Sequence, residues 1–117
     1  MKRFCIFAIA LAALTTPAFS QDAANYPGRP IRVIVPFAPG GGLDISTRLI
    51  GQKLTEKWGQ NIVVDSRPGA ATIVGTEIAS KATSDGYTLL MITTTFAINP
   101  GLYPKLPYDP VKNFTPV

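Results

Sequence analysis

Three consecutive glycines, Gly40, Gly41 and Gly42, follow Pro39 and form the segment of this sequence best suited to holding a ligand. They stand between an apolar run, residues 31–37, and an amphipathic stretch, an order that predicts a strand, a tight turn and a helix. Glycine lets a ligand approach the backbone closely, and the first N–H groups of a helix lack partners within the helix. Such N–H groups favour a negative charge, so the segment predicts a cradle for a small anion.

Two further loops are expected at the same edge of the sheet. Gly69, Ala70 and Ala71 follow a second apolar run, and Thr94 and Thr95 follow a third. Strands that alternate with helices form parallel sheets with right-handed crossovers, which bring the loops after all strands to one edge. Ligands of open α/β sheets bind at this edge, so the three loops predict one shared crevice.

The chemistry of this crevice is limited by residue types that the sequence lacks. The chain has no histidine, which excludes serine–histidine and cysteine–histidine catalysis and removes the commonest metal ligand. A dinucleotide loop starting at Gly40 would need glycine at position 45, where the chain has Ile45, and no Gly-Lys-Ser/Thr triplet is present. A carboxylate fits better, because it accepts charge-assisted hydrogen bonds from loop N–H groups without needing a lysine or arginine. The sequence therefore predicts no catalytic residue, no metal site and no cofactor.

The candidate residues also have structural explanations. The glycines can serve only to make a sharp turn. Asp44 can contact the ligand, but an N-cap role or an ion pair with Arg48 is favoured, because a bare carboxylate repels an anion. Thr94 and Thr95 can donate hydroxyl groups to a substrate or cap the element that follows. Arg67 can neutralise the ligand or point into solvent, and the sequence leaves these alternatives open.

The elements that must position the loops follow the apolar periodicity. Strands are predicted at residues 31–35, 61–65 and 87–92, and helices at residues 45–58 and 72–82. Gly59 is expected to close the first helix in a left-handed conformation. The buried face of this helix is expected at Leu43, Thr47, Ile50, Leu54 and Trp58. The third strand is almost entirely apolar and is expected at the centre of the sheet, so the predicted fold class is α/β, three layers with a mostly parallel sheet and flanking helices.

The first residues have the pattern of an export signal. Lys2 and Arg3 precede an apolar run at residues 4–14, and small residues lead to Ser20. This order predicts a cleavable signal peptide over residues 1–20, because the apolar run is far shorter than the roughly 20 residues of a membrane-spanning helix. The protein is therefore expected to be exported.

Residues 21–117 are predicted to form one incomplete α/β lobe. Without Lys2 and Arg3 the eleven basic residues become nine against seven acidic ones, and their scattered placement gives no argument for nucleic-acid binding. Five prolines lie between Asn99 and Val117, which predicts an extended connector. A second lobe is expected to follow, and one lobe alone is expected to bind a ligand weakly.

An ordered series of motifs resembles one known family. It comprises Tyr26-Pro27 to Pro30-Ile31, Val35-Pro36-Phe37-Ala38-Pro39-Gly40-Gly41 with Asp44 and Arg48, Arg67-Pro68-Gly69-Ala70 with Gly75, Asp85-Gly86-Tyr87-Thr88-Leu89-Leu90, Asn99-Pro100 with Leu102-Tyr103, and Leu106-Pro107-Tyr108-Asp109-Pro110. In content and order these motifs resemble the Bug-type periplasmic solute receptors of tripartite tricarboxylate transporters. The resemblance spans residues 26–117 and corresponds to the N-terminal portion of a family member, well under half of its length.

The resemblance implies a type II-like periplasmic binding protein, in which two α/β lobes close on a small carboxylate and deliver it to a membrane permease. The ligand would be a dicarboxylate, a tricarboxylate, an amino acid or an aromatic acid. The resemblance also implies that main-chain groups of the first two loops hold the carboxylate, at residues 39–43 and 68–71. The sequence departs from the family pattern where Ala71, Thr72 and Ile73 replace a run of small, glycine-bearing residues.

One alternative from another class is an exported α/β enzyme fragment whose catalytic residues lie outside this sequence. Thermal stabilisation by a carboxylate without turnover favours a receptor, because a ligand bound only by the folded state raises its stability. Turnover favours the enzyme. We expect a receptor and not an enzyme.

Overall fold

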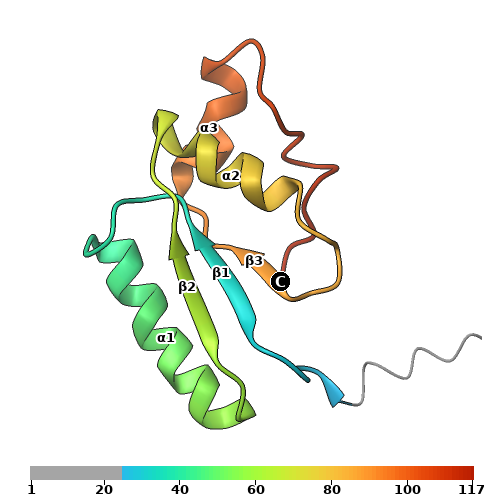
Figure 1. The fold of residues 1–117 in the computed structure, drawn as a ribbon. Coiled ribbons are helices and arrows are strands. Elements are labelled where there is room, and N and C mark those ends of the chain that lie inside the picture. The colour runs from blue at the N-terminus through green and yellow to red at the C-terminus, as the bar shows by residue number, and fades with distance from the viewer. Residues whose placement is uncertain (1–24) are drawn as a thin grey trace, which may run out of the picture.

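The computed structural model describes residues 25–117, and the predicted signal peptide lies outside these residues. Strands and helices alternate along the chain as predicted (Figure 1). In order they are β1 (Ile31–Val35), α1 (Gly42–Trp58), β2 (Ile62–Ser66), the short 3-10 turn η2 (Ala70–Thr72), α2 (Ile73–Ser80), β3 (Thr88–Leu90) and α3 (Thr94–Leu102). The α/β fold class is therefore confirmed.

The three strands form one parallel sheet in the order β2-β1-β3. Ile31 of β1 pairs with Ile62 of β2, and Arg32 pairs with Thr88 of β3. Within residues 25–117 the prediction that the third strand is central is wrong, because β1 has a partner on each side there and is the most deeply buried strand. An apolar strand with one neighbour and half-exposed residues has the same composition as a central one, so the sequence did not distinguish them.

Helices cover both faces of this sheet. Gly51 of α1 lies against Ile62, so close that a β-carbon on Gly51 would be 3.1 Å from the Ile62 side chain. Gly75 of α2 lies against Pro36, where an added β-carbon would be 2.7 Å from the proline ring. Because side chains alternate between the faces of a strand, the register places Ile62 and Pro36 on opposite faces. The three-layer arrangement is confirmed, and α2 and α3 gather near the carboxyl ends of the strands (Figure 1).

The first helix ends as predicted but is rotated from its predicted orientation. Gly59 has a φ of 69° and donates its N–H to the Thr55 carbonyl at 2.9 Å, which confirms the left-handed cap. Ile50 and Trp58, predicted as buried, are 51% and 38% exposed. The buried residues of the helix are smaller or polar: Thr47, as predicted, and also Asp44 and Gly51. The absence of a side chain at Gly51 allows close approach to the sheet and turns the larger residues outward.

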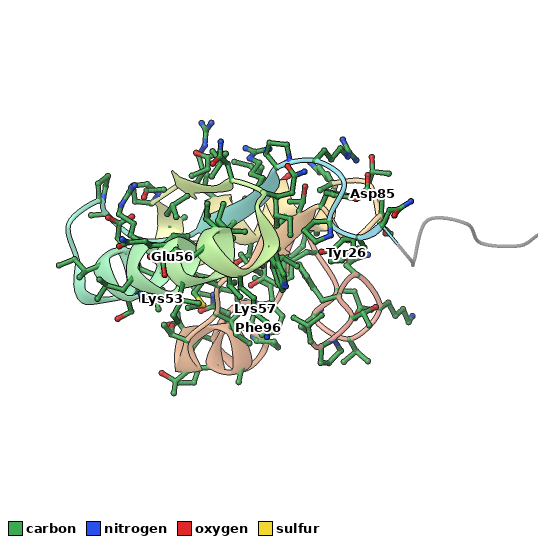
Figure 2. All side chains as sticks on the ribbon, turned by 90° about the horizontal axis from the view of Figure 1, so that it is seen from below. Tyr26, Lys53, Glu56, Lys57, Asp85 and Phe96 are labelled. Carbon is green, nitrogen blue, oxygen red and sulfur yellow. The ribbon has the colours of Figure 1, made fainter. Side chains whose placement is uncertain are left out.

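The exposed side of α1 carries charged residues beside the outward-facing apolar ones. Lys53 and Glu56 form an ion pair with 2.8 Å between the ammonium nitrogen and a carboxylate oxygen. Figure 2 labels this pair and Lys57 on the same helix. Pairs at this spacing on an exposed helix contribute only a few tenths of a kcal/mol.

The predicted connector is partly wrong, since its first residues belong to α3. Pro100 lies in the last turn of this helix, and because proline has no N–H it removes one backbone hydrogen bond shortly before the helix ends. At the end of the helix, the Tyr103 N–H donates to the Asn99 carbonyl at 2.9 Å. Residues 103–117 contain no further helix or strand, so the prediction of irregular structure is confirmed there.

An aromatic cluster packs the chain end against α3. The ring of Phe96 stacks with that of Tyr108 at 6.1 Å between centroids, and Phe114 meets Phe96 edge-on at 5.4 Å. Tyr108 is 6% exposed and belongs to the buried hydrophobic residues of the described chain. The final segment is therefore held by side-chain packing in place of backbone pairing.

The segment before β1 is attached to the turn before β3. The Tyr26 hydroxyl donates to the Gly86 carbonyl at 2.7 Å, and Arg29 forms an ion pair with Asp85 at 2.6 Å. The Arg29 guanidinium also lies 4.2 Å from the ring centroid of Tyr87. We call this group the N-terminal clasp; Tyr26 and Asp85 are labelled in Figure 2, which views the molecule from this end.

Candidate ligand-binding site

The parallel sheet brings the predicted loops to one edge. The first loop (residues 36–41) follows β1 and the second loop (residues 67–72) follows the neighbouring strand β2. Backbone pairing continues to the start of the second loop, where the Arg67 N–H donates to the Val35 carbonyl at 2.7 Å. The prediction that these loops share one edge is confirmed, and it is the geometry in which open α/β sheets bind ligands.

The first loop presents a helix start without a side-chain cap. Gly41 is the N-cap residue of α1 and makes no side-chain capping bond, and the first helical bond runs from the Ile45 N–H to the Gly41 carbonyl at 3.0 Å. Among residues 25–117, no acceptor faces the N–H groups of Gly42 and Leu43. Residues 39–42 are exposed and Leu43 is half-buried, so the Gly42 N–H lies on the exposed loop and the Leu43 N–H at its border. An uncapped helix start favours an anion.

Asp44 lies beneath this loop and is almost fully buried. One carboxylate oxygen accepts the Gly40 N–H at 3.0 Å and the other accepts the Ser66 hydroxyl at 2.8 Å, so Asp44 joins the first loop to the end of β2. Arg48 donates to both oxygens, at 2.9 and 3.1 Å, which confirms the predicted ion pair. The alternative of an N-cap is wrong, because Gly41 occupies that position. The hydrogen bonds from Arg48, Gly40 and Ser66 hold the pKa of Asp44 well below its usual range.

The second loop has a strained backbone. Gly69 has a φ of 138°, and Ala70, Ala71 and Thr72 follow with φ values of 45°, 51° and 76°. Within residues 25–117 these three are the only residues other than glycine with positive φ. Each such L-residue costs roughly 1–2 kcal/mol relative to a right-handed conformation. Ala71 and Thr72 are two of the three positions, with Ile73, at which the sequence analysis noted a departure from a glycine-bearing pattern, and glycine adopts positive φ without this strain.

Asn99 of α3 holds the second loop, and sequence reasoning did not identify it as a site residue. Its side chain is fully buried, and Nδ2 donates to the Ala71 carbonyl at 2.9 Å and more weakly to the Thr72 hydroxyl at 3.4 Å. The Thr76 hydroxyl donates to the Thr72 carbonyl at 2.9 Å. The available signal was an amide side chain directly after the apolar residues 96–98, in a segment interpreted as a connector.

The third predicted loop lies on the other side of β1. Thr93 is the N-cap residue of α3, and Thr94 and Thr95 belong to the first turn of the helix. Thr94 is exposed, whereas Thr95 is half-buried and accepts a hydrogen bond from the Thr93 hydroxyl at 3.2 Å. Neither Thr94 nor Thr95 caps the helix, so that alternative is wrong. Their contact with a ligand stays a prediction.

A small charge network borders the second loop. Asp65 at the end of β2 accepts hydrogen bonds from Arg32 and from Arg67, the latter at 2.8 Å. Mainly through the Arg32 hydrogen bond, these contacts lower the pKa of Asp65. Arg67 is half-exposed, and its charge is directed at Asp65. An ion pair between Arg67 and Asp65 was not among the alternatives considered from the sequence.

Other possible sites in the described residues are poor. A groove of about 450 Å³ runs along α1 and the outer edge of β2, lined among others by Gln52 and Glu56, and not at the two loops. Residues 25–117 contain no cluster of three or more potential metal-binding side chains. None of the helices in this range has the length and hydropathy needed to cross a bilayer.

Comparisons with known proteins identify one family. The family model for the tripartite tricarboxylate transporter family receptor matches residues 46–117. A UPF0065 protein in the tcbD-tcbE intergenic region of Pseudomonas sp. (strain P51) is 40% identical over 116 residues, covering 99% of this chain and 34% of the relative. The chain spans about a third of the length of the curated relatives it matches.

Solved structures show the same fold. The periplasmic binding protein BugD is 35% identical with a TM-score of 0.72, covering 76% of this chain and 30% of BugD. MatC from Rhodopseudomonas palustris with bound malate is 38% identical with a TM-score of 0.72, covering 79% and 32%. Another R. palustris protein, solved with adipate, is 34% identical with a TM-score of 0.62, covering 73% and 29%.

These relatives share a class as well as a fold. The matched family consists of solute-binding receptors and not of enzymes, as the sequence predicted. The motifs, the three-layer parallel sheet and the family model, which matches more than half of the chain, agree with one another. The chain therefore belongs to the tripartite tricarboxylate transporter family receptors.

Proposed function

We propose that residues 21–117 form part of the N-terminal lobe of a periplasmic receptor, exported by a signal peptide at residues 1–20. The complete receptor captures a small carboxylate and delivers it to the membrane permease of a tripartite transporter. Two relatives solved with malate and with adipate support a dicarboxylate as the ligand. Tricarboxylates, amino acids and aromatic acids are the other members of the expected ligand class.

The observation that carries this proposal is the uncapped start of α1 at the exposed first loop. A carboxylate placed there accepts the N–H groups of Gly42 and Leu43, and the second loop supplies further backbone donors from the adjacent strand. Asp44 does not oppose the ligand, because Arg48 balances its charge and protein donors surround both of its oxygens. The proposed ligand-contacting residues are Pro39, Gly40, Gly41, Gly42, Gly69, Ala70 and Ala71, with the hydroxyl groups of Thr94 and Thr95 at the border of the site. Asp44 supports this site from beneath.

Gly42 allows a matched test of the backbone donors. It is the first helical residue of α1, a position where proline is tolerated, and Gly41 before it has φ −72° and ψ 165°, which suits a residue that precedes proline. Gly42→Pro removes one N–H group while preserving the helix. Gly42→Ala retains the N–H group, and its new β-carbon has no other atom within 4 Å.

The test uses a complete receptor, called here the hybrid receptor, in which residues 25–117 replace the matching segment of MatC. Malate and adipate affinities are measured by calorimetry. A hydrogen bond to a charged group contributes about 1.5–3 kcal/mol, so Gly42→Pro is expected to weaken binding at least tenfold, and Gly42→Ala less than threefold. Equal affinities for the two variants would contradict the backbone-donor site. A folded, unmodified hybrid receptor that binds neither malate, adipate nor any other acid of the expected class would contradict the proposed function.

A further inference from the structure

The second loop has an unusual conformation that its own sequence does not favour. Three residues in succession adopt positive φ without being glycine, and Thr72 is β-branched, the residue class for which this conformation is least favourable. A strained backbone of this kind persists only where surrounding contacts determine it, and such strain is concentrated at ligand sites. The contacts that hold this loop therefore bear on the geometry of the site.

Asn99 of α3 makes the contact that fixes the backbone conformation of the second loop. Asn99 lies 28 residues after Ala71 in the sequence, and its Nδ2 holds the Ala71 carbonyl at 2.9 Å. In a trans peptide the carbonyl and the following N–H point in opposite directions. A carbonyl of Ala71 held toward α3 therefore directs the Thr72 N–H away from α3.

Packing alone does not explain the burial of Asn99. The side chain is fully buried, and its Oδ1 atom has no hydrogen-bond partner within residues 25–117. Burying an unpaired amide oxygen is unfavourable, so an apolar residue of similar size would serve packing better. What asparagine adds at this position is the Nδ2 donor to the loop.

We propose that Asn99 is a positioning residue for the ligand site. It fixes the peptide between Ala71 and Thr72, so that the second loop keeps its strained conformation and directs the Thr72 N–H toward a bound carboxylate. The proposal rests on the proposed function, because it assigns a role within the same site. Asn99 itself does not contact the ligand.

The test separates loop positioning from general stability. Asn99→Leu removes the donor and keeps a similar volume. Thr76→Val is the matched control, because it also removes a buried hydrogen bond to the second loop, but to the Thr72 carbonyl and not to the Ala71 carbonyl. In the hybrid receptor, Asn99→Leu is expected to weaken malate binding at least tenfold, and Thr76→Val less than threefold at a comparable loss of thermal stability.

A second part of the test compares denaturation midpoints, which needs no ligand, and it uses the full chain as well as the hybrid receptor. A loop released from Asn99 can recover its strain when residue 71 is alanine but has no strain to recover when it is glycine, so Asn99→Leu is expected to lower the denaturation midpoint more in the Ala71→Gly background than in the parent. The same background is expected to restore part of the lost malate affinity. Additive midpoints, or equal affinity losses in Asn99→Leu and Thr76→Val, would overturn the proposal. A parent that binds no acid of the expected class but has non-additive midpoints would overturn only the proposed function.

Discussion

Replacing Ala71 with glycine is expected to stabilise the protein, although glycine usually destabilises. Ala71 has φ 51° and ψ 46°, close to the ideal left-handed conformation, and its side chain is exposed, so the substitution removes no packing. The strain relieved is roughly 1–2 kcal/mol. Against it stands the greater flexibility of glycine in the unfolded chain, about 0.4–1 kcal/mol. The expected net gain in the free energy of unfolding is about 0.5–1 kcal/mol.

The control is Ala97→Gly, which also removes an exposed methyl group, but from the right-handed helix α3. Glycine there is expected to lower the free energy of unfolding by about 1 kcal/mol. Urea denaturation followed by circular dichroism measures both variants against the same parent. The expected difference between the variants is about 1.5–2 kcal/mol, about a tenfold change in the folding equilibrium or more. If Ala71→Gly lowered stability as much as Ala97→Gly, the left-handed conformation assigned to Ala71 would be refuted.

Two further predictions concern the contacts beneath the loops. Gly75→Ala would place a β-carbon 2.7 Å from Pro36 and 2.8 Å from the Arg67 carbonyl oxygen, so a loss of roughly 1–3 kcal/mol is expected in thermal unfolding. Gly101→Ala meets no atom within 4 Å and serves as the control; similar losses in both would contradict the packing argument. Asp44 has a lowered pKa when folded, so its stabilisation is complete above the unfolded value of about 3.9 and is lost as pH falls below it. Asp44→Asn should therefore be less stable than the parent at pH 7 and lose less stability between pH 5 and 2; parallel pH profiles would disprove this.

The alternation of elements could be predicted because it follows from local patterns. The bounds of β1 and the left-handed cap at Gly59 match the structure. Strand order was not predictable in the same way, because the apolar residues of β3 suit a central and an outer strand equally. The orientation of α1 depends on Gly51 approaching Ile62, a contact between segments that periodicity alone does not reveal.

The candidate site was predicted at the level of loops and not at the level of their supports. The positions of Gly40 and Gly69 after parallel strands follow from chain order and turn chemistry. The support from Asn99 was missed because its partner Ala71 is distant in sequence, and because the following Pro100 indicated an irregular segment. The link from Asp44 to Ser66 was missed for the same reason, since it joins residues 22 positions apart.

The N-terminal clasp has a practical consequence for sensor construction. Tyr26 and Arg29 attach the start of the described chain beside Gly86 and Asp85, at the amino ends of the strands, whereas the two loops lie at the carboxyl ends. A fluorophore or surface linker joined before Asn25 would be attached at the end of the sheet opposite the two loops of the candidate site. Immobilisation through that end is expected to leave the two loops accessible to small acids in solution.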